Sequence, residues 1–270
     1  MSNFDMKGWT IVPNVANVAK QRLKQGQAVL AVTVNWLDAG LGEFLGWLGV
    51  DCLVADGEHC ALTDDKLEHL IRAGDGVGIP TLVRLPFDGP TLARYQNMGA
   101  RGVQVPMVTN KDAARAIVEW VKYPPIGKRG LGITRSRGYG TTKEPLSEYT
   151  ARVNQDTLIV AQVEDQEGIR ALPQILDTDG IDVILVGTLD LSQEFGVPGQ
   201  TSHPHVLTAV DAIAGECQSH HVTMGLPVSR PDDVAAAYRR GARFLLVSLT
   251  VLLRWGVESF VAARDQVNAP

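Results

Sequence analysis

The chain has 270 residues, with 25 Lys and Arg against 30 Asp and Glu and a net charge of −5. Charges of both signs are mixed along it, so no basic block could neutralise a row of phosphates, and we expect no nucleic-acid partner. No apolar run reaches the roughly 20 residues that span a bilayer, so we expect no membrane partner. The three cysteines lack C-x-x-C spacing, which argues against disulfides and structural zinc and favours a cytoplasmic location.

Short β-rich apolar runs alternate with amphipathic segments along the whole chain. An amphipathic stretch at about residues 13–25 predicts an N-terminal helix ahead of the first strand. Strands are predicted at residues 28–34, 52–55, 81–84, 102–105, 158–163, 182–187, 222–226 and 244–248. Helices are predicted at residues 38–48, 64–73, 90–98, 111–121, 166–176, 204–219, 231–240 and 250–263.

This alternation predicts the fold class. Eight strand-then-helix units in about 250 residues favour an α/β fold of the (β/α)8 TIM-barrel type over a doubly wound sheet, which usually has fewer strands. We expect residues 1–270 to form a single domain.

Two stretches, residues 123–157 and 187–205, interrupt the alternation. Both are rich in turn-forming residues and are longer than an ordinary connection, and such loops are usually functional or disordered. We interpret both as loops that follow a strand and precede its helix, which would place them at the catalytic face of a barrel.

Ionisable residues follow the second and third predicted strands, where a barrel carries its active-site groups. Asp56-Gly57-Glu58-His59 follows the second strand. A carboxylate can orient a histidine ring for proton transfer near neutral pH, although a polar loop with a hydrogen-bonded histidine is the alternative. Arg84 ends the third strand, and its planar fork suits a substrate carboxylate or phosphate; the alternative is an ion pair with a neighbouring loop.

Two carboxylates are predicted at neighbouring strand ends. Because strand side chains alternate, Gln162 and Glu164 are expected to face the barrel interior together, with Val163 facing the helices. Asp190 follows the sixth strand. Oxygen ligands from adjacent strand ends are a usual way to hold Mg²⁺ or another hard divalent ion. A hydrogen-bonded pair of structural carboxylates is the alternative.

Taken together, these motifs resemble the HpcH/HpaI aldolase family, whose best-known members are metal-dependent (class II) 4-hydroxy-2-oxoheptane-1,7-dioate aldolases. The resemblance covers about residues 26–254, and its motifs occur in family order. It rests on Asp56-Gly-Glu-His59, Arg84, Tyr123-Pro-Pro…Lys128-Arg-Gly-x-Gly132, Gln162-Val-Glu164 and Gly187-x-x-Asp190-Leu-Ser192.

The resemblance implies a (β/α)8 barrel, a divalent cofactor (Mg²⁺, Mn²⁺ or Co²⁺) and a homo-oligomer, usually a hexamer whose dimers exchange the last helix. Glu164 and Asp190 match the metal ligands. His59 with Asp56 matches the base that works through a water. The positions that match the pyruvate site are Arg84, Gln162, Gly187, Thr188 and Leu189.

Three departures from the family pattern concern the surroundings of these residues. Thr188 stands where the family usually has proline in Gly-Pro-x-Asp, and Asn97 stands where many relatives have Asp. An acidic residue often found after the last strand is missing around residues 247–250. These changes leave the metal and enolate chemistry intact and concern the second substrate.

The sequence therefore predicts a carbon–carbon lyase that cleaves or forms 4-hydroxy-2-oxo acids through a pyruvate enolate, with pyruvate and an aldehyde as its small-molecule partners. A lyase or synthase that uses the same enolate to decarboxylate or condense oxaloacetate is the alternative. A catalytically inactive barrel that binds a metabolite is a third hypothesis.

Overall fold

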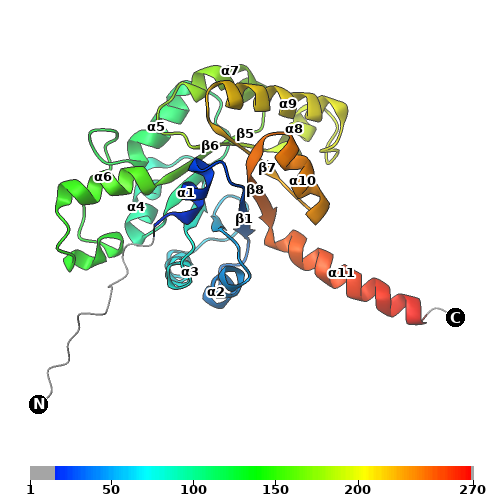
Figure 1. Cartoon of the computed structure of the whole chain (residues 1–270), viewed down its shortest axis with the longest axis horizontal. Coiled ribbons are helices and arrows are strands. Elements are labelled where there is room, and N and C mark those ends of the chain that lie inside the picture. Colours follow the sequence, from blue (N-terminus) through cyan, green and yellow to red (C-terminus); the bar gives the residue numbers. More distant parts are fainter. Residues whose placement is uncertain (1–15, 269–270) are drawn as a thin grey trace, which may run out of the picture.

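The computed structural model describes residues 16–268, in which eight parallel strands close into a barrel in sequence order. Helices surround the barrel (Figure 1). This arrangement is the predicted (β/α)8 TIM barrel, and every predicted strand is present. The strands are β1(Val29–Val34), β2(Cys52–Asp56), β3(Thr81–Arg84), β4(Gly102–Val105), β5(Leu158–Val163), β6(Val183–Val186), β7(Thr223–Pro227) and β8(Ala242–Ser248).

The helices match the predicted ones to within a few residues, and the structure adds α6, α8 and a short 3₁₀ helix, η1. Residues 13–15 of the predicted N-terminal helix lie outside the described residues. Within residues 16–268, no helix is both long and apolar enough to cross a membrane. The helices are α1(Val18–Lys24), α2(Ala39–Trp47), α3(Asp64–Gly76), α4(Gly89–Met98), α5(Lys111–Val121), η1(Arg135–Gly140), α6(Leu146–Asp156), α7(Gln166–Leu176), α8(Thr188–Glu194), α9(Pro204–Ser219), α10(Pro231–Arg239) and α11(Leu249–Asn268).

The core has two layers because strand side chains alternate between the barrel interior and the helices. In β5, Leu158 and Val160 belong to an apolar cluster that fills the barrel interior. Ile159, Ala161 and Val163 belong to the larger cluster between strands and helices. Val163 therefore faces the helices, as its alternation with Gln162 and Glu164 predicts.

The two interrupted stretches differ from the prediction. Residues 123–157 contain η1 and α6, and they follow helix α5 and precede β5. They lie at the amino ends of the strands, so the predicted place at the catalytic face is wrong for this stretch. Residues 187–205 follow β6 and contain α8. Turn-forming residues around α6 and α8 interrupt the helical periodicity, so the sequence pattern did not predict these two helices.

Helix α11 extends away from the barrel and carries the described chain to Asn268 (Figure 1). Its first residue, Leu249, is its only buried residue. The helix otherwise presents both polar and apolar side chains to solvent.

Candidate active site

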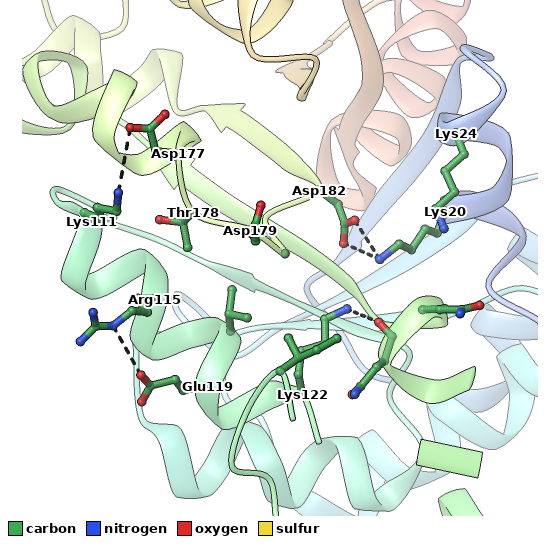
Figure 2. Close-up of a pocket in the computed structure, with 15 residues that line it drawn as sticks. Lys20, Lys24, Lys111, Arg115, Glu119, Lys122, Asp177, Thr178, Asp179 and Asp182 are labelled. Atoms are coloured by element: carbon green, nitrogen blue, oxygen red, sulfur yellow. Dashed lines mark hydrogen bonds and ion pairs between the residues drawn. The ribbon is translucent and has the colours of Figure 1, made fainter. Parts of the chain in front are cut away.

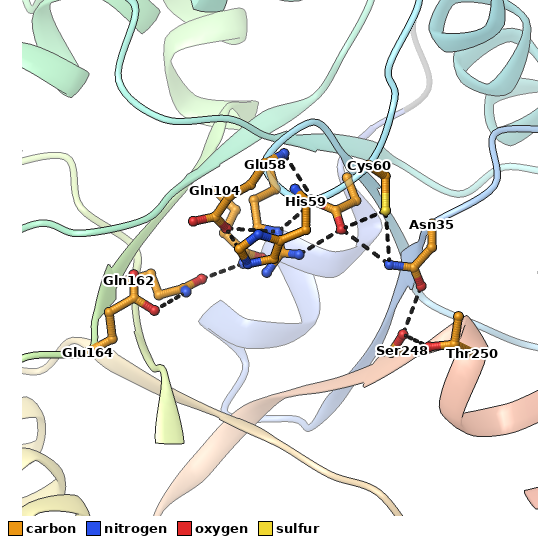
Figure 3. Close-up of polar contacts among 11 residues, drawn as sticks. Asn35, Glu58, His59, Cys60, Gln104, Gln162, Glu164, Ser248 and Thr250 are labelled. Atoms are coloured by element: carbon orange, nitrogen blue, oxygen red, sulfur yellow. Dashed lines mark hydrogen bonds and ion pairs between the residues drawn. The ribbon is translucent and has the colours of Figure 1, made fainter. Parts of the chain in front are cut away.

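The carboxyl ends of β2, β3, β4 and β5 bring polar side chains together at one end of the barrel (Figure 3). Glu58 and His59 lie between the Gln104–Gln162–Glu164 group and the Asn35–Cys60 group in this view (Figure 3). Residues far apart in the chain thus line the same opening of the barrel, its mouth at the carboxyl ends of the strands. They meet there because parallel strands place their carboxyl ends at the same edge.

Asp56 and Arg84 form a tight ion pair at this mouth. They are register neighbours on β2 and β3, and Asp56 is fully buried. Arg84 Nε donates to Asp56 Oδ1 at 3.0 Å and Arg84 Nη2 donates to Oδ2 at 2.8 Å. Burial by itself raises the pKa of Asp56, but the bonds and charge of Arg84 lower it overall. The ion pair expected as an alternative for Arg84 is therefore present, and its substrate role stays a prediction.

The imidazole of His59 has a different partner from the one predicted. The main-chain N–H groups of Glu58 and His59 donate to Asp56 Oδ1 at 3.1 and 3.2 Å. The His59 ring is 64% exposed, and its Nε2 lies 3.6 Å from Glu58 Oε2. Asp56 thus holds the main chain of His59, whereas the carboxylate next to the ring belongs to Glu58. Asp56 is occupied by Arg84 and by this turn, which explains why it does not reach the imidazole.

Glu58 is a residue to which the sequence assigned no separate role. Its Oε2 is buried without a hydrogen-bond partner and lies 3.4 Å from Arg84 Nε. Burial raises the pKa of Glu58, and the charges of Asp56 and Asp190 raise it further against the opposing charges of Arg84 and His59. Glu58 therefore adds negative charge to the mouth near Asp190.

Glu164 is the most buried carboxylate of the predicted metal pair, with 3% of its surface exposed. Its Oε1 accepts the main-chain N–H of Met107 at 2.9 Å, and its Oε2 accepts Nε2 of Gln162. Burial raises the pKa of Glu164 to about 7, and the nearby Asp190 carboxyl adds to this effect. Gln162 and Glu164 therefore lie on the same inner face at the end of β5, as predicted. This placement lets the two side chains form a hydrogen bond with each other.

Two residues that position Glu164 were missed by sequence reasoning. Gln104 on β4 is fully buried and donates Nε2 to Gln162 Oε1 at 2.7 Å, which fixes the amide that contacts Glu164. A polar residue between valines in a core strand was the available signal. Met107 has a left-handed φ of 55°, an uncommon conformation for a residue other than glycine. This conformation aims its N–H at Glu164, and no sequence signal marks it.

The segment that begins α8 lies against Glu164. Gly187 is buried, and a Cβ atom at this position would overlap the Glu164 side chain, so glycine makes room for that carboxylate. Thr188 is half-buried, whereas Leu189 and Asp190 are exposed in the first turn of the helix. Two carboxylates, one buried among N–H donors and one at the open side, form a donor set that suits a hard divalent cation.

The positions that depart from the family pattern have structural partners. Asn97 lies near the end of α4, and its Oδ1 accepts Nη2 of Arg129 at 2.8 Å. Ser248 Oγ donates to Asn35 Oδ1 at 2.8 Å and lies 2.7 Å from Thr250 Oγ1, which ties β8 to β1 at the mouth (Figure 3). Hydroxyl groups thus stand where an acidic residue is common.

Comparisons with known proteins agree with this geometry. A model of the HpcH/HpaI aldolase/citrate lyase family matches residues 38–253. The chain belongs to this family. It is 29% identical over 243 residues to a 2-keto-3-deoxy-L-rhamnonate aldolase from Escherichia coli O157:H7, covering 88% of this chain and 89% of the relative. The assignment confirms the resemblance drawn from the motifs, and with it a carbon–carbon lyase of the class II, metal-dependent aldolase type.

Solved structures give the same picture. The crystal structure of an HpcH/HpaI aldolase from Desulfitobacterium hafniense DCB-2 has a TM-score of 0.89 and 26% identity, covering 94% of this chain and 98% of that one. The crystal structure of citrate synthase SbnG has a TM-score of 0.83 and 28% identity, covering 94% and 99%. This aldolase therefore has the same barrel fold as proteins named for different reactions, an aldolase and a citrate synthase.

Proposed function

We propose that this aldolase cleaves and forms 4-hydroxy-2-oxo acids through the enolate of pyruvate, with Mg²⁺, Mn²⁺ or Co²⁺ held by Glu164 and Asp190. The observation that supports it most is the buried Glu164 carboxylate, whose contacts are N–H donors and whose pKa is raised by burial and by Asp190. Two acidic groups this close favour a cation between them. When bound, the metal supplies positive charge that polarises a substrate carbonyl.

Residues around the barrel axis bind pyruvate and stabilise its enolate. Arg84, held in place by Asp56, stabilises the negative charge that grows on the enolate oxygen. The amide of Gln162, fixed by Gln104, orients the substrate carboxylate together with the main chain at Thr188 and Leu189. Gly187 contributes the space that Glu164 needs beside them.

Proton transfer belongs to His59, whose exposed ring stands at the mouth where an aldehyde would enter. His59 moves a proton to or from the hydroxyl derived from the aldehyde through a water molecule. Glu58 lies beside the ring, and Asp56 acts by holding the turn that carries it. This division of roles replaces the expected direct contact between Asp56 and the imidazole.

The test is a pyruvate-release assay over a panel of 4-hydroxy-2-oxo acids, before and after exhaustive chelation. We expect turnover that disappears with the metal and returns with Mg²⁺, Mn²⁺ or Co²⁺. Full turnover after chelation contradicts the metal, and no release from any member of the panel contradicts the aldolase assignment.

A second candidate function keeps the enolate and changes its partner. The similarity to the structure of citrate synthase SbnG supports a reaction that decarboxylates or condenses oxaloacetate. Including oxaloacetate in the same panel separates this reaction from aldol cleavage. An inactive, metabolite-binding barrel would turn over none of these compounds.

We also propose a homo-oligomer, a hexamer whose subunits exchange the last helix, in the cytoplasm. Helix α11 exposes Trp255, Val257 and Phe260, and α2 exposes Phe44 and Trp47. Exposed apolar surfaces of this kind usually mark partner contacts. All three cysteines are unpaired, which suits a reducing compartment. A monomer by light scattering at micromolar concentration contradicts the assembly.

A further inference from the structure

Large apolar side chains are exposed on the connections that surround the mouth of the barrel. They follow four different strands and are each between 46% and 62% exposed: Trp36 after β1, Phe87 after β3, Met107 after β4 and Leu189 after β6. We call these four residues the apolar rim. The connections after barrel strands carry the groups that contact substrate, and apolar surface left open there marks a binding partner.

Two residues of the apolar rim are next to the acidic pair. The main-chain N–H of Met107 donates to Glu164 Oε1 at 2.9 Å. Gly187 lies so close to the other oxygen of Glu164 that a Cβ atom there would overlap it, and Leu189 follows two residues later, directly before Asp190. The apolar rim therefore begins within one or two residues of the groups proposed to hold the metal.

The other two residues of the apolar rim are on either side of the connection that carries His59. This connection follows β2, whose neighbours in the barrel are β1 and β3. Trp36 is on the connection after β1, next to Asn35, whose Nδ2 donates to Asp56 Oδ2 at 3.2 Å. Phe87 is on the connection after β3. A substrate carbonyl beside His59 would thus have aromatic side chains on both neighbouring connections.

The charges at the mouth disfavour a second substrate that carries a carboxylate of its own. Within residues 16–268, the connections that lead from strands β1 to β7 into the following helices contain no lysine and one arginine, Arg230. Arg84 is held by Asp56 and lies 3.4 Å from Glu58. Glu58 and Asp190 add negative charge, so an anionic aldehyde would be repelled.

The uncharged polar groups of the mouth are already paired with one another. Ser248 Oγ donates to Asn35 Oδ1 at 2.8 Å and lies 2.7 Å from Thr250 Oγ1. An aldehyde rich in hydroxyl groups needs a hydrogen-bond partner for each hydroxyl that it buries, and a site without free partners disfavours it. An apolar chain needs no such partners and gains free energy when it covers apolar surface.

We propose that the second substrate of this aldolase is an aldehyde with an uncharged hydrocarbon chain, which lies against the apolar rim while its carbonyl group lies beside His59. This inference rests on the proposed function, because it names the aldehyde class for the same reaction. The apolar rim selects the chain by covering it, and the acidic mouth selects against a charged end.

The experiment measures kcat/KM for the addition of pyruvate to acetaldehyde, propanal, butanal and pentanal, with pyruvate and metal saturating. Carbonyl reactivity changes little along this series, so the slope reports contact with the chain. We expect kcat/KM to rise about 2–4-fold with each added methylene, as partial to full burial of that group implies. Succinic semialdehyde and 3-hydroxybutanal, which add a carboxylate or a hydroxyl to four carbons, should react with a lower kcat/KM than butanal.

Variants of the apolar rim test where the chain lies. Trp36→Gln and Phe87→Ser should each lower kcat/KM for pentanal by about 5–10-fold and flatten the rise with chain length, because the aldehyde loses apolar contacts. Ile133→Ser removes an exposed apolar side chain from the connection between α5 and η1. It is the matched control and should keep the wild-type series.

Three kinetic outcomes overturn the proposal: a flat series in the wild type, a higher kcat/KM for succinic semialdehyde or 3-hydroxybutanal than for butanal, or an unchanged series in both rim variants. A changed oligomeric state of Trp36→Gln and Phe87→Ser by light scattering would assign the apolar rim to a subunit contact and also overturns it. Circular dichroism confirms that each variant folds, and if one does not, the other decides the question.

A separate measurement distinguishes failure of this inference from failure of the proposed function. Exchange of deuterium from D2O into the methyl group of pyruvate requires the enolate but no aldehyde. Exchange together with a flat series contradicts the aldehyde class and leaves the proposed function in place. No exchange contradicts the proposed function, and this inference fails with it.

Discussion

The two ends of the barrel bury charges of opposite sign. At the carboxyl ends of the strands, Glu58 and Glu164 are held near Arg84 and near main-chain N–H groups. At the amino ends, Lys20 and Lys122 are held by the main-chain oxygen of Thr157. Side chains of opposite charge also contribute at both ends: Arg84 lies near Glu58 at the mouth, and Asp182 pairs with Lys20 at the other end (Figure 2). One barrel thus buries carboxylates at the carboxyl ends of its strands and lysine amines at the amino ends.

The largest expected effect tests whether His59 and Arg84 have separate roles in the reaction. His59→Ala should slow aldol cleavage by roughly 10²–10⁴ while sparing oxaloacetate decarboxylation, which has no hydroxyl to deprotonate. Arg84→Ala should slow both reactions by roughly 10²–10³, since both form the enolate. Steady-state kinetics with both substrates at saturating metal measures this. Equal slowing of the two reactions by His59→Ala would make His59 a structural or binding residue.

The next effect concerns the acidic pair. Glu164→Gln should lose metal affinity by more than the roughly 10–100-fold typical of groups outside the ligand shell, because it removes a charged ligand. Calorimetric titration with Mn²⁺ measures the affinity directly, without relying on turnover. Glu58→Gln is the matched control, and we expect a smaller loss there. A larger loss in Glu58→Gln would move the metal away from Glu164.

A smaller effect compares two buried glutamines at opposite ends. Gln104→Met should weaken oxalate binding by about 10-fold, because Gln162 loses the donor that orients its amide. Gln96→Met removes a bond to the main-chain oxygen of Gly102 at the start of β4 and should leave oxalate affinity unchanged. Titrations of the metal-loaded variants with oxalate measure both. Equal weakening in the two variants would mean that Gln104 has only a structural role.

The smallest effect belongs to the basic end and appears as a pH dependence. The pKa of Lys122 is lowered to about 7 in the folded protein, whereas an unfolded lysine titrates near 10.4. Between these values the unfolded state binds more protons, so the free energy of unfolding rises with pH. The charged groups that act on Lys122 are Lys20, Lys24 and Asp182.

Relative to Lys122→Met, the wild type should therefore gain about 1–2 kcal/mol of stability between pH 7 and pH 9. Urea unfolding of both proteins at the two pH values measures the difference, and effects of groups other than Lys122 cancel in the comparison. Parallel pH profiles would show that Lys122 keeps its ordinary pKa in the folded protein.

Local pattern predicted the barrel and part of its mouth. The alternation of apolar runs and amphipathic segments specified eight strands. Each barrel strand is buried on both faces, so each one appears in the sequence as its own apolar run. The spacing of Gln162 and Glu164 placed both on the inner face of β5 for the same reason. The stretch at residues 123–157 was misplaced although the predicted helix at residues 111–121 and the predicted strand at residues 158–163 put it between a helix and the next strand. In a (β/α)8 barrel such a connection lies at the amino ends of the strands, away from the catalytic face.

The sequence by itself determined the fold class, the order of the strands and the motifs that identify the family, since these depend on residue type and on spacing along one strand or turn. Only the tertiary structure decided which side chains meet. It placed the His59 ring against Glu58, aimed the N–H of Met107 at Glu164, and used Gln104 to hold Gln162. It also brought the main-chain oxygens of Asn154 and Thr157 to the buried amine of Lys122. These contacts join segments of different strands and helices or depend on backbone torsions, so they exist only once the barrel has closed.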